Sequence, residues 1–120
     1  MDTKTSRSQQ LEVRMLNFST CVIAATKTTP RTDENLIITK QLIRSATSIG
    51  ANYTEANNAA SKLDFRNKIF IAKKEAAETR YWLQLLAKTN PVVDLQHLIG
   101  EGTELLLILQ KIVTTLRNSK

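Results

Sequence analysis

Apolar residues recur along this chain at alternating steps of four and three, the spacing that places side chains on one face of an α-helix. Four segments follow this pattern and predict helices over residues 7–28, 33–58, 62–89 and 93–117. Pro30 and Pro91 interrupt the pattern between segments, because proline cannot continue a helix. Ser61, and either Thr32 or Asp33, are suited to cap the helices that follow them. We therefore expect four amphipathic helices joined by short connections.

Short connections between long amphipathic helices force consecutive helices to run antiparallel. The chain has 120 residues, of which 42% are hydrophobic, and this suits one domain, 1–120, with a single core. Aromatic residues make up only 5%, and three Gly and two Pro leave little material for the many turns of a β-sandwich or barrel. The predicted fold is an all-α, antiparallel up-down-up-down four-helix bundle.

A second apolar column lies beside the first on the third and fourth predicted helices. Its members are Leu63, Phe70 and Ala77 on the third and Leu105, Ile108 and Ile112 on the fourth. We expect a small bundle to leave such columns uncovered, and exposed apolar surface of this extent is typical of a subunit interface. The pattern therefore predicts a homo-oligomer.

Two polar columns face one another if the second and third helices form an antiparallel hairpin. They comprise Arg44, Ser48, Asn52 and Glu55 on the second helix, and Asp64, Lys68, Glu75, Glu78 and Trp82 on the third. The hairpin brings Arg44 towards Glu75 and Glu78, and Glu55 towards Lys68. Two interpretations stay open: an interhelical ion-pair network that fixes the register of the helices, and a polar pocket or conduit inside an assembly.

A basic column follows the third helix, with no acidic residue on the same face. It consists of Lys62, Arg66, Lys73 and Arg80. At about 1.5 Å rise per residue it spans roughly 27 Å, enough to follow several phosphates of a nucleic-acid strand. The chain has 17 basic and 11 acidic residues, for a net charge of +6, which favours an anionic partner. The other interpretation is a solvated helix face.

The sequence offers no arrangement suited to catalysis or to a cofactor. Cys21 and His97 are the only cysteine and histidine, so we expect neither a thiolate cage nor a His-rich metal site within one chain. Glu75 and Glu78 have a spacing found in di-iron bundles, but the Glu-x-x-His motifs of those sites are missing. We expect no catalytic residue, no metal and no cofactor, and no enzymatic activity.

The longest aliphatic run, residues 105–109, is far shorter than the roughly 20 residues that cross a bilayer. The first residues are polar and lack the apolar stretch of a secretory signal. We therefore expect a cytoplasmic protein without a membrane partner.

The middle of the chain contains three distinctive stretches, QLIRSATSIGANYTEA at 41–56, SKLDF at 61–65 and KKEAAETRYWL at 73–83. In these stretches the chain resembles the bacterial family named for the 23S rRNA intervening-sequence protein. The resemblance implies a cytoplasmic four-helix bundle that assembles as a ring, typically a homopentamer. It also implies likeness to the accessory variability protein of diversity-generating retroelements, a nucleic-acid-binding partner of a reverse transcriptase. The nine residues of the two polar columns are the signature positions that the resemblance carries over.

These observations predict a non-enzymatic, homo-oligomeric helical scaffold that binds RNA or DNA through its basic column. Phosphate contacts with little sequence readout are expected, because the column has no interleaved exposed aromatic side chains. The alternative is a structural or protein-docking module that binds no nucleic acid. A third hypothesis is an RNA-processing enzyme that uses Asp64, Glu75 and Glu78 with a divalent ion.

Overall fold

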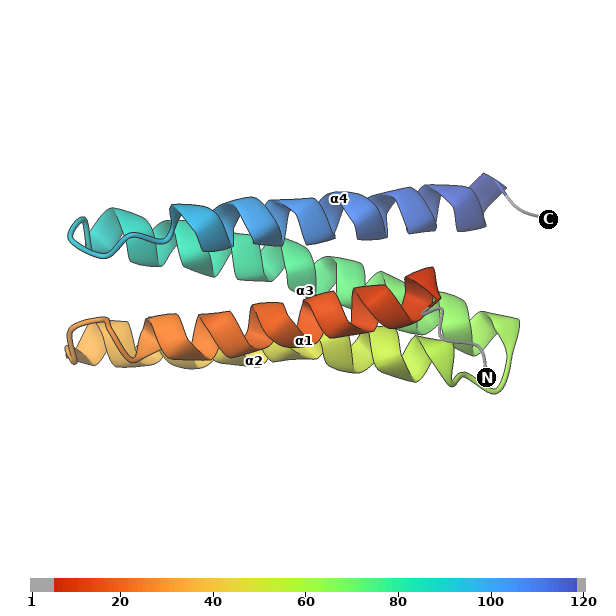
Figure 1. Ribbon diagram of the computed structural model, residues 1–120, viewed down its shortest axis with the longest axis horizontal. Coiled ribbons are helices and arrows are strands. Elements are labelled where there is room, and N and C mark those ends of the chain that lie inside the picture. The colour runs from red at the N-terminus through yellow and green to blue at the C-terminus, as the bar shows by residue number, and fades with distance from the viewer. Residues whose placement is uncertain (1–5, 119–120) are drawn as a thin grey trace.

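Four α-helices joined by short loops make up the computed structural model of the chain, which describes residues 6–118. They are α1 (Arg7–Thr26), α2 (Asp33–Asn57), α3 (Lys62–Thr89) and α4 (Gln96–Asn118). Consecutive helices run in opposite directions, as the colour gradient in Figure 1 shows, and the described residues contain no strand. The predicted all-α, up-down-up-down four-helix bundle is confirmed.

Side-chain caps determine where the first three helices begin. The Ser6 hydroxyl accepts a hydrogen bond from the Gln9 N–H (3.0 Å), and the Gln9 side chain accepts one from the Ser6 N–H (3.1 Å), forming a capping box. The hydroxyls of Thr32 and Ser61 each accept the N–H three residues further on. At its other end α1 stops at Thr26, two residues before the predicted end, because the chain turns there through hydrogen bonds that span three residues.

The fourth helix begins at Gln96, three residues later than the sequence pattern predicts. The Val93 N–H donates to the Asn90 carbonyl (3.0 Å) and closes a turn around Pro91, so this stretch cannot enter the helix. The Asp94 carboxylate then accepts the Gln96 N–H (3.1 Å). The turn and the carboxylate together account for the late start.

One hydrophobic core runs along the bundle and receives side chains from all four helices. Its largest fully buried members include Met15, Leu42, Ile49, Ile69, Leu83, Leu86, Leu105 and Leu109. Burying one such side chain contributes about 1.5–3 kcal/mol of hydrophobic free energy. The core therefore supplies most of the favourable free energy of folding.

The second apolar column of α3 lies mostly outside the core, as predicted. Leu63 is 68% exposed and Ala77 is also exposed. Phe70 is half-buried, and the guanidinium carbon of Arg117 lies 5.7 Å from the centre of its ring. This column is therefore apolar surface with one covered member.

The second column of α4 differs from the prediction. Leu105 is 0% exposed and belongs to the core, so the expectation that a small bundle leaves it uncovered is wrong. Leu106 and Leu109 are buried as well, because the apolar stripe of α4 is wider than a single column and turns its centre inward. Ile108 and Ile112 are half-buried at the edge of the core.

The contact between α2 and α3 is the most extensive in the bundle. Three small, fully buried side chains, Ala46, Ala72 and Ala76, allow the helices to approach closely. The buried hydroxyls of Ser45 and Thr79 hydrogen-bond to each other across the contact at 2.9 Å. The small residues and this hydrogen bond fix the two helices as one hairpin.

A buried amide pair closes the end of the bundle where the α1–α2 and α3–α4 connections lie. Asn35 Nδ2 donates to Asn90 Oδ1 (2.8 Å), and Asn90 Nδ2 donates to Asn35 Oδ1 (3.0 Å). Each amide also donates to a backbone carbonyl, Asn35 to Pro30 (2.9 Å) and Asn90 to Leu86 (3.0 Å). The pair ties the start of α2 to the end of α3.

Replacing Asn35 with Leu should lower the free energy of unfolding by about 1–3 kcal/mol, because the buried Asn90 amide would lose its partner. Urea denaturation followed by circular dichroism measures the change. The matched control is Asn67→Leu at an exposed position of α3, which should change stability by less than about 0.5 kcal/mol. Equal losses in the two variants would contradict a special role for the amide pair.

Candidate functional site

The polar columns of α2 and α3 meet along one side of the helical hairpin. Arg44 forms ion pairs with Glu75 (Nη1 to Oε1, 3.2 Å) and with Glu78. About two to three turns away, Lys68 Nζ lies 2.8 Å from Glu55 Oε1. These are the pairings that the antiparallel arrangement predicts, and they are confirmed.

Glu78 links the ion pairs to the single tryptophan of the chain. Trp82 Nε1 donates to Glu78 Oε2 at 2.8 Å, the same oxygen that Arg44 contacts. Arg44 Nε also donates to Gln41 Oε1 at 3.0 Å. The guanidinium is therefore held by three side chains, and the indole of Trp82 is fixed beside them.

The remaining signature residues lie on the same columns without joining the interhelical ion pairs. Ser48 and Asn52 donate to backbone carbonyls one turn earlier in α2, each at 2.8 Å. The hydrogen bond to Glu55 raises the pKa of Lys68 above its ordinary value, and the charge of Asp64 adds to the effect. This geometry matches an ion-pair network that fixes helix register. The pocket or conduit inside an assembly stays a hypothesis.

A basic face extends along α3 and onto the end of α4. We use this name for Lys62, Arg66, Lys73, Arg80 and Arg117. Arg117 joins the four predicted residues because its guanidinium lies over Phe70, between Arg66 and Lys73 on the same stripe of α3. Within residues 6–118, no member of the basic face forms an ion pair with a carboxylate. The sequence pattern missed Arg117, because only the packing of α4 against α3 brings it there.

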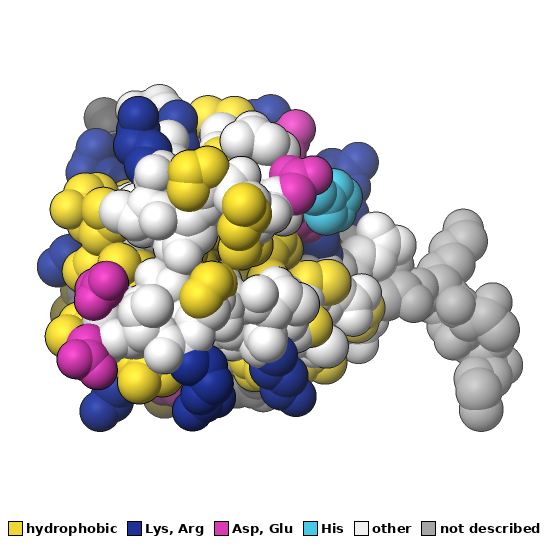
Figure 2. All heavy atoms as spheres, turned by 90° about the vertical axis from the view of Figure 1, so that its left-hand side faces the viewer, with side chains coloured by type: hydrophobic (Ala, Val, Ile, Leu, Met, Phe, Trp, Pro, Cys, Tyr) yellow, Lys and Arg dark blue, Asp and Glu magenta, His cyan; other side chains and the backbone are white. Residues whose placement is uncertain are grey.

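The neighbouring stripe of α4 is also free of acidic residues. Reading back from Arg117 at steps of three and four, it carries Thr114, Gln110, Leu107 and Thr103. By contrast, the end of the bundle where the α1–α2 and α3–α4 connections lie carries basic and acidic side chains together, with apolar ones between them (Figure 2). Charge of one sign therefore gathers along the side of the bundle and not at this end.

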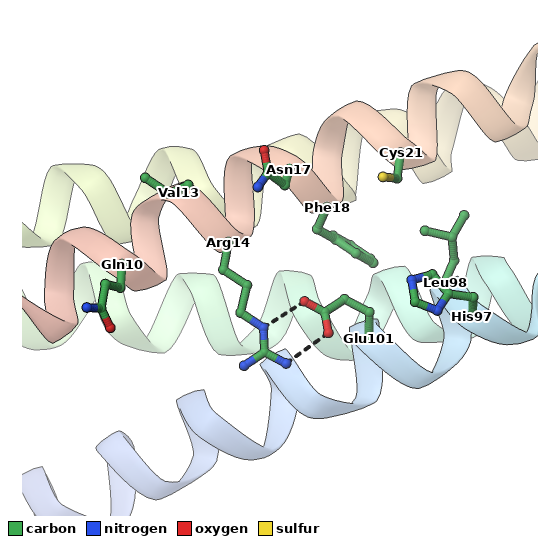
Figure 3. Close-up of a pocket in the computed structure, with 9 residues that line it drawn as sticks. All are labelled: Gln10, Val13, Arg14, Asn17, Phe18, Cys21, His97, Leu98 and Glu101. Atoms are coloured by element: carbon green, nitrogen blue, oxygen red, sulfur yellow. Dashed lines mark hydrogen bonds and ion pairs between the residues drawn. The ribbon is translucent and has the colours of Figure 1, made fainter. Parts of the chain in front are cut away.

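A bidentate ion pair joins α1 to α4, and the sequence pattern did not indicate it. Arg14 Nε and Nη2 donate to the two carboxylate oxygens of Glu101, at 2.7 and 2.8 Å. The pair crosses a hollow of about 320 Å³ between the two helices, into which Phe18 and Leu98 point (Figure 3). The hydrogen bond from Arg14 lowers the pKa of Glu101 below its ordinary value, and the charge of Arg14 and nearby His97 act in the same direction.

The hollow is also lined by Cys21 and His97, which are the single cysteine and the single histidine of the chain. Glu101 is the nearby carboxylate, and it is engaged by Arg14. Among residues 6–118, no group of three or more His, Cys, Asp or Glu side chains is placed to hold a metal ion. In the same part of the chain, no helix has the length and apolar character needed to cross a bilayer.

The fold and the site together define a class of protein: four-helix bundles with a network of ion pairs between α2 and α3. The sequence model of the 23S rRNA-intervening sequence protein family matches residues 9–111, and the chain belongs to this family. The match includes the polar columns and all of the basic face except Arg117. The resemblance identified from residues 41–56, 61–65 and 73–83 is thereby confirmed.

A solved structure of similar fold supports this assignment. It is the crystal structure of a protein with unknown function from the S23 ribosomal protein family of Bacteroides thetaiotaomicron VPI-5482. The two chains are 35% identical, the alignment covers 91% of this chain and 99% of that one, and the TM-score is 0.80. Comparison with curated proteins gave no match. The comparisons establish family and fold, and they leave the activity open.

The Arg14–Glu101 pair should make stability depend on pH in the acid range. A lowered folded-state pKa means that the Glu101 contribution is present above its unfolded-state pKa of about 4.3 and is lost as pH falls through the lower folded value. At pH 7, Glu101→Gln should cost about 0.5–1 kcal/mol, since the pair is partly exposed. The difference from the unmodified chain should shrink below about pH 4. A difference in urea-unfolding free energy that stays constant from pH 7 to pH 3 would contradict this account.

Proposed function

We propose that this protein is a non-enzymatic scaffold of the cytoplasm that assembles as a homopentamer and binds RNA or DNA through its basic face. The observation that carries the proposal is the basic face itself. Five basic side chains follow one side of the bundle, and none is neutralised by a carboxylate among residues 6–118. Arg14, Arg44 and Lys68 are paired, whereas other basic residues such as Arg7 and Lys111 form no ion pair within residues 6–118. The basic face is distinguished by the alignment of its side chains along one side of the bundle.

Lysine and arginine side chains that follow one helix without carboxylate partners are suited to bind a polyanion such as RNA or DNA. Release of counterions from the phosphates provides the free energy of such binding, and each neutralised phosphate adds to it. The rise from Lys62 to Arg80 is about 27 Å, so the basic face contacts several phosphates in succession. A pentamer carries five times the net charge of +6 and so strengthens the attraction.

The basic face favours phosphate contacts over the reading of bases. Phe70, on the same stripe of α3, is half-buried and covered by Arg117, so this ring offers no platform on which a base can stack. Sequence readout also needs side chains that reach the edges of bases, and long flexible lysines and arginines on a straight helix mainly contact the backbone. We therefore expect affinity with little sequence preference.

Exposed apolar surface supports assembly. Leu16 is 66% exposed and, together with Ile23 and Ala51, lines a groove of about 570 Å³ between α1 and α2. Leu63 and Ala77 are exposed on α3. Apolar side chains grouped in this way are typical of surfaces that a second subunit covers. The number of subunits in the proposal comes from the family resemblance.

The alternative is a structural or protein-docking module without nucleic-acid binding. It is supported by the network around Arg44, in which opposite charges satisfy one another and stabilise the hairpin. In that case the basic face is a solvated surface. The following experiment separates the two functions.

Reversing two charges on the basic face should weaken binding of single-stranded RNA and duplex DNA by at least about tenfold, because several phosphate contacts are lost. The variant is Lys73→Glu with Arg80→Glu. Fluorescence anisotropy over a salt series measures affinity, and the slope of log K against log salt should become shallower by about two. The control is Arg31→Glu with Lys40→Glu, which changes the net charge equally at exposed positions elsewhere.

Equal weakening in the two double variants would mean that net charge alone attracts the nucleic acid, and the basic face would not be the site. Absence of binding by the unmodified chain at low salt would favour the docking module. Metal-dependent cleavage of the RNA probe that disappears in Glu75→Gln would contradict a non-enzymatic function.

The assembled protein should have a mass of about five times 13.5 kDa by light scattering coupled to size exclusion. Leu16→Glu should reduce that mass, because it replaces an exposed apolar side chain, which the proposed interface covers, with a charged one. The control is Val92→Glu, at a position 89% exposed in the α3–α4 connection, which should leave the mass unchanged. A monomeric mass for the unmodified chain would contradict the proposed assembly.

A further inference from the structure

A second feature, independent of the basic face, is an apolar groove of about 440 Å³ between the start of α1 and the second half of α4. It lies on the same α1–α4 seam as the hollow of Figure 3, nearer the ends of the chain than the Arg14–Glu101 pair. We call it the seam groove. Its apolar lining is formed by Leu11 of α1, Tyr53 of α2, and Ile108, Ile112 and Leu116 of α4.

The seam groove exists because α1 and α4 make the least contact of any neighbouring helices in the bundle. Both pack mainly on the α2–α3 hairpin, and their edges next to each other stay partly open. Ile108 and Ile112 are therefore half-buried, although they continue the stripe that supplies the core. This leaves apolar side chains that the chain itself does not cover.

The charged residues that line the seam groove are both basic. Arg7 comes from α1 and Lys111 from α4, and no acidic residue lines the groove. Within residues 6–118, neither of the two forms an ion pair. Three hydroxyls add polar character, from Ser8, Tyr53 and Thr115. Ser8 Oγ lies 3.1 Å from the hydroxyl of Tyr53, a residue only 6% exposed. The groove thus combines an apolar trough with cations and hydroxyls along its border.

We propose that the seam groove binds a single-chain amphiphile with an anionic head group, such as a medium-chain carboxylate. The alkyl chain lies along the aliphatic side chains, where it is removed from water. The carboxylate accepts charge-assisted hydrogen bonds from Arg7 and Lys111. The volume falls within the usual range of small-molecule sites, about 300–1,000 Å³.

The dimensions favour an alkyl chain over a partner helix. The α4 residues that line the groove run from Ile108 to Leu116, a rise of about 12 Å. An extended chain of about nine or ten carbons has this length, at roughly 1.25 Å per carbon along the zigzag of C–C bonds. A helix laid in the same space would place only two or three anchor residues. One alkyl chain fills the whole trough.

The test is isothermal titration of the full chain with decanoate, kept below its micelle concentration. We expect one saturable site per chain with a dissociation constant below about 1 mM. Decanol and decyltrimethylammonium, which share the chain length but not the anionic head, should bind at least about tenfold more weakly. Together these three probes separate head-group recognition from simple apolar binding.

Variants locate the site. Lys111→Glu should weaken decanoate binding by about tenfold and strengthen binding of decyltrimethylammonium, because the charge at the border is reversed. The matched control is Lys40→Glu, an equal change at an exposed position of α2, which should have no effect. The double variant Lys73→Glu, Arg80→Glu should also keep its decanoate affinity, so failure here is distinguishable from failure of the basic face. Circular dichroism confirms that each variant is folded.

Five results would overturn the proposal. A lack of saturable decanoate binding would count against it, as would equal binding of the three probes or undiminished binding by Lys111→Glu. An Ile112→Glu variant that dissociates the assembly, while the unmodified chain ignores decanoate, would instead identify the groove as a subunit interface. Binding of an acidic amphipathic peptide but not of decanoate would indicate a protein partner.

Discussion

The close approach of α2 and α3 is the constraint on which the rest of the bundle depends. Small buried side chains bring the helices together, and the hydrogen bond between Ser45 and Thr79 requires one register in a contact that excludes water. Once that register is set, Arg44 reaches Glu75 and Glu78 on the outer side. The surface ion pairs are thus a consequence of the buried contact as well as a contribution to it. The outer helices, α1 and α4, then pack on a preformed hairpin.

Much of this arrangement was predictable from the sequence, because its causes are local. Helical periodicity depends on residues three and four apart, and the hydroxyl of Ser61 caps a helix that begins at the next residue. Consecutive helices joined by a tight turn have only one antiparallel register in which Arg44 and Lys68 both meet carboxylates. For the same reason, residue spacing alone places the basic residues of α3 on one face of the helix.

The features that escaped prediction depend on how non-consecutive parts of the chain meet. Asn35 and Asn90 are 55 residues apart, and Arg14 and Glu101 are 87 apart, so no spacing rule connects them. The burial of Leu105 does not follow from periodicity, because the rotation of α4 about its own axis decides which apolar column turns inward, and that rotation depends on the shape of the surface beneath it. Periodicity fixes the faces of a helix, whereas packing fixes the direction in which they point.

The amide pair of Asn35 and Asn90 makes the two ends of the bundle mechanically unequal. At that end the α1–α2 connection and the end of α3 are joined by hydrogen bonds that cannot be exchanged for water without cost. At the opposite end, Ser8 and Tyr53 join their hydroxyls and Asn57 donates to Glu12, so the start of α1 is held to α2. The last turns of α4 form no ion pair among the described residues. Local opening therefore has a direction, and backbone amides should exchange with solvent fastest where α4 ends. The two ends of the bundle therefore differ in how firmly the fourth helix is joined to the others.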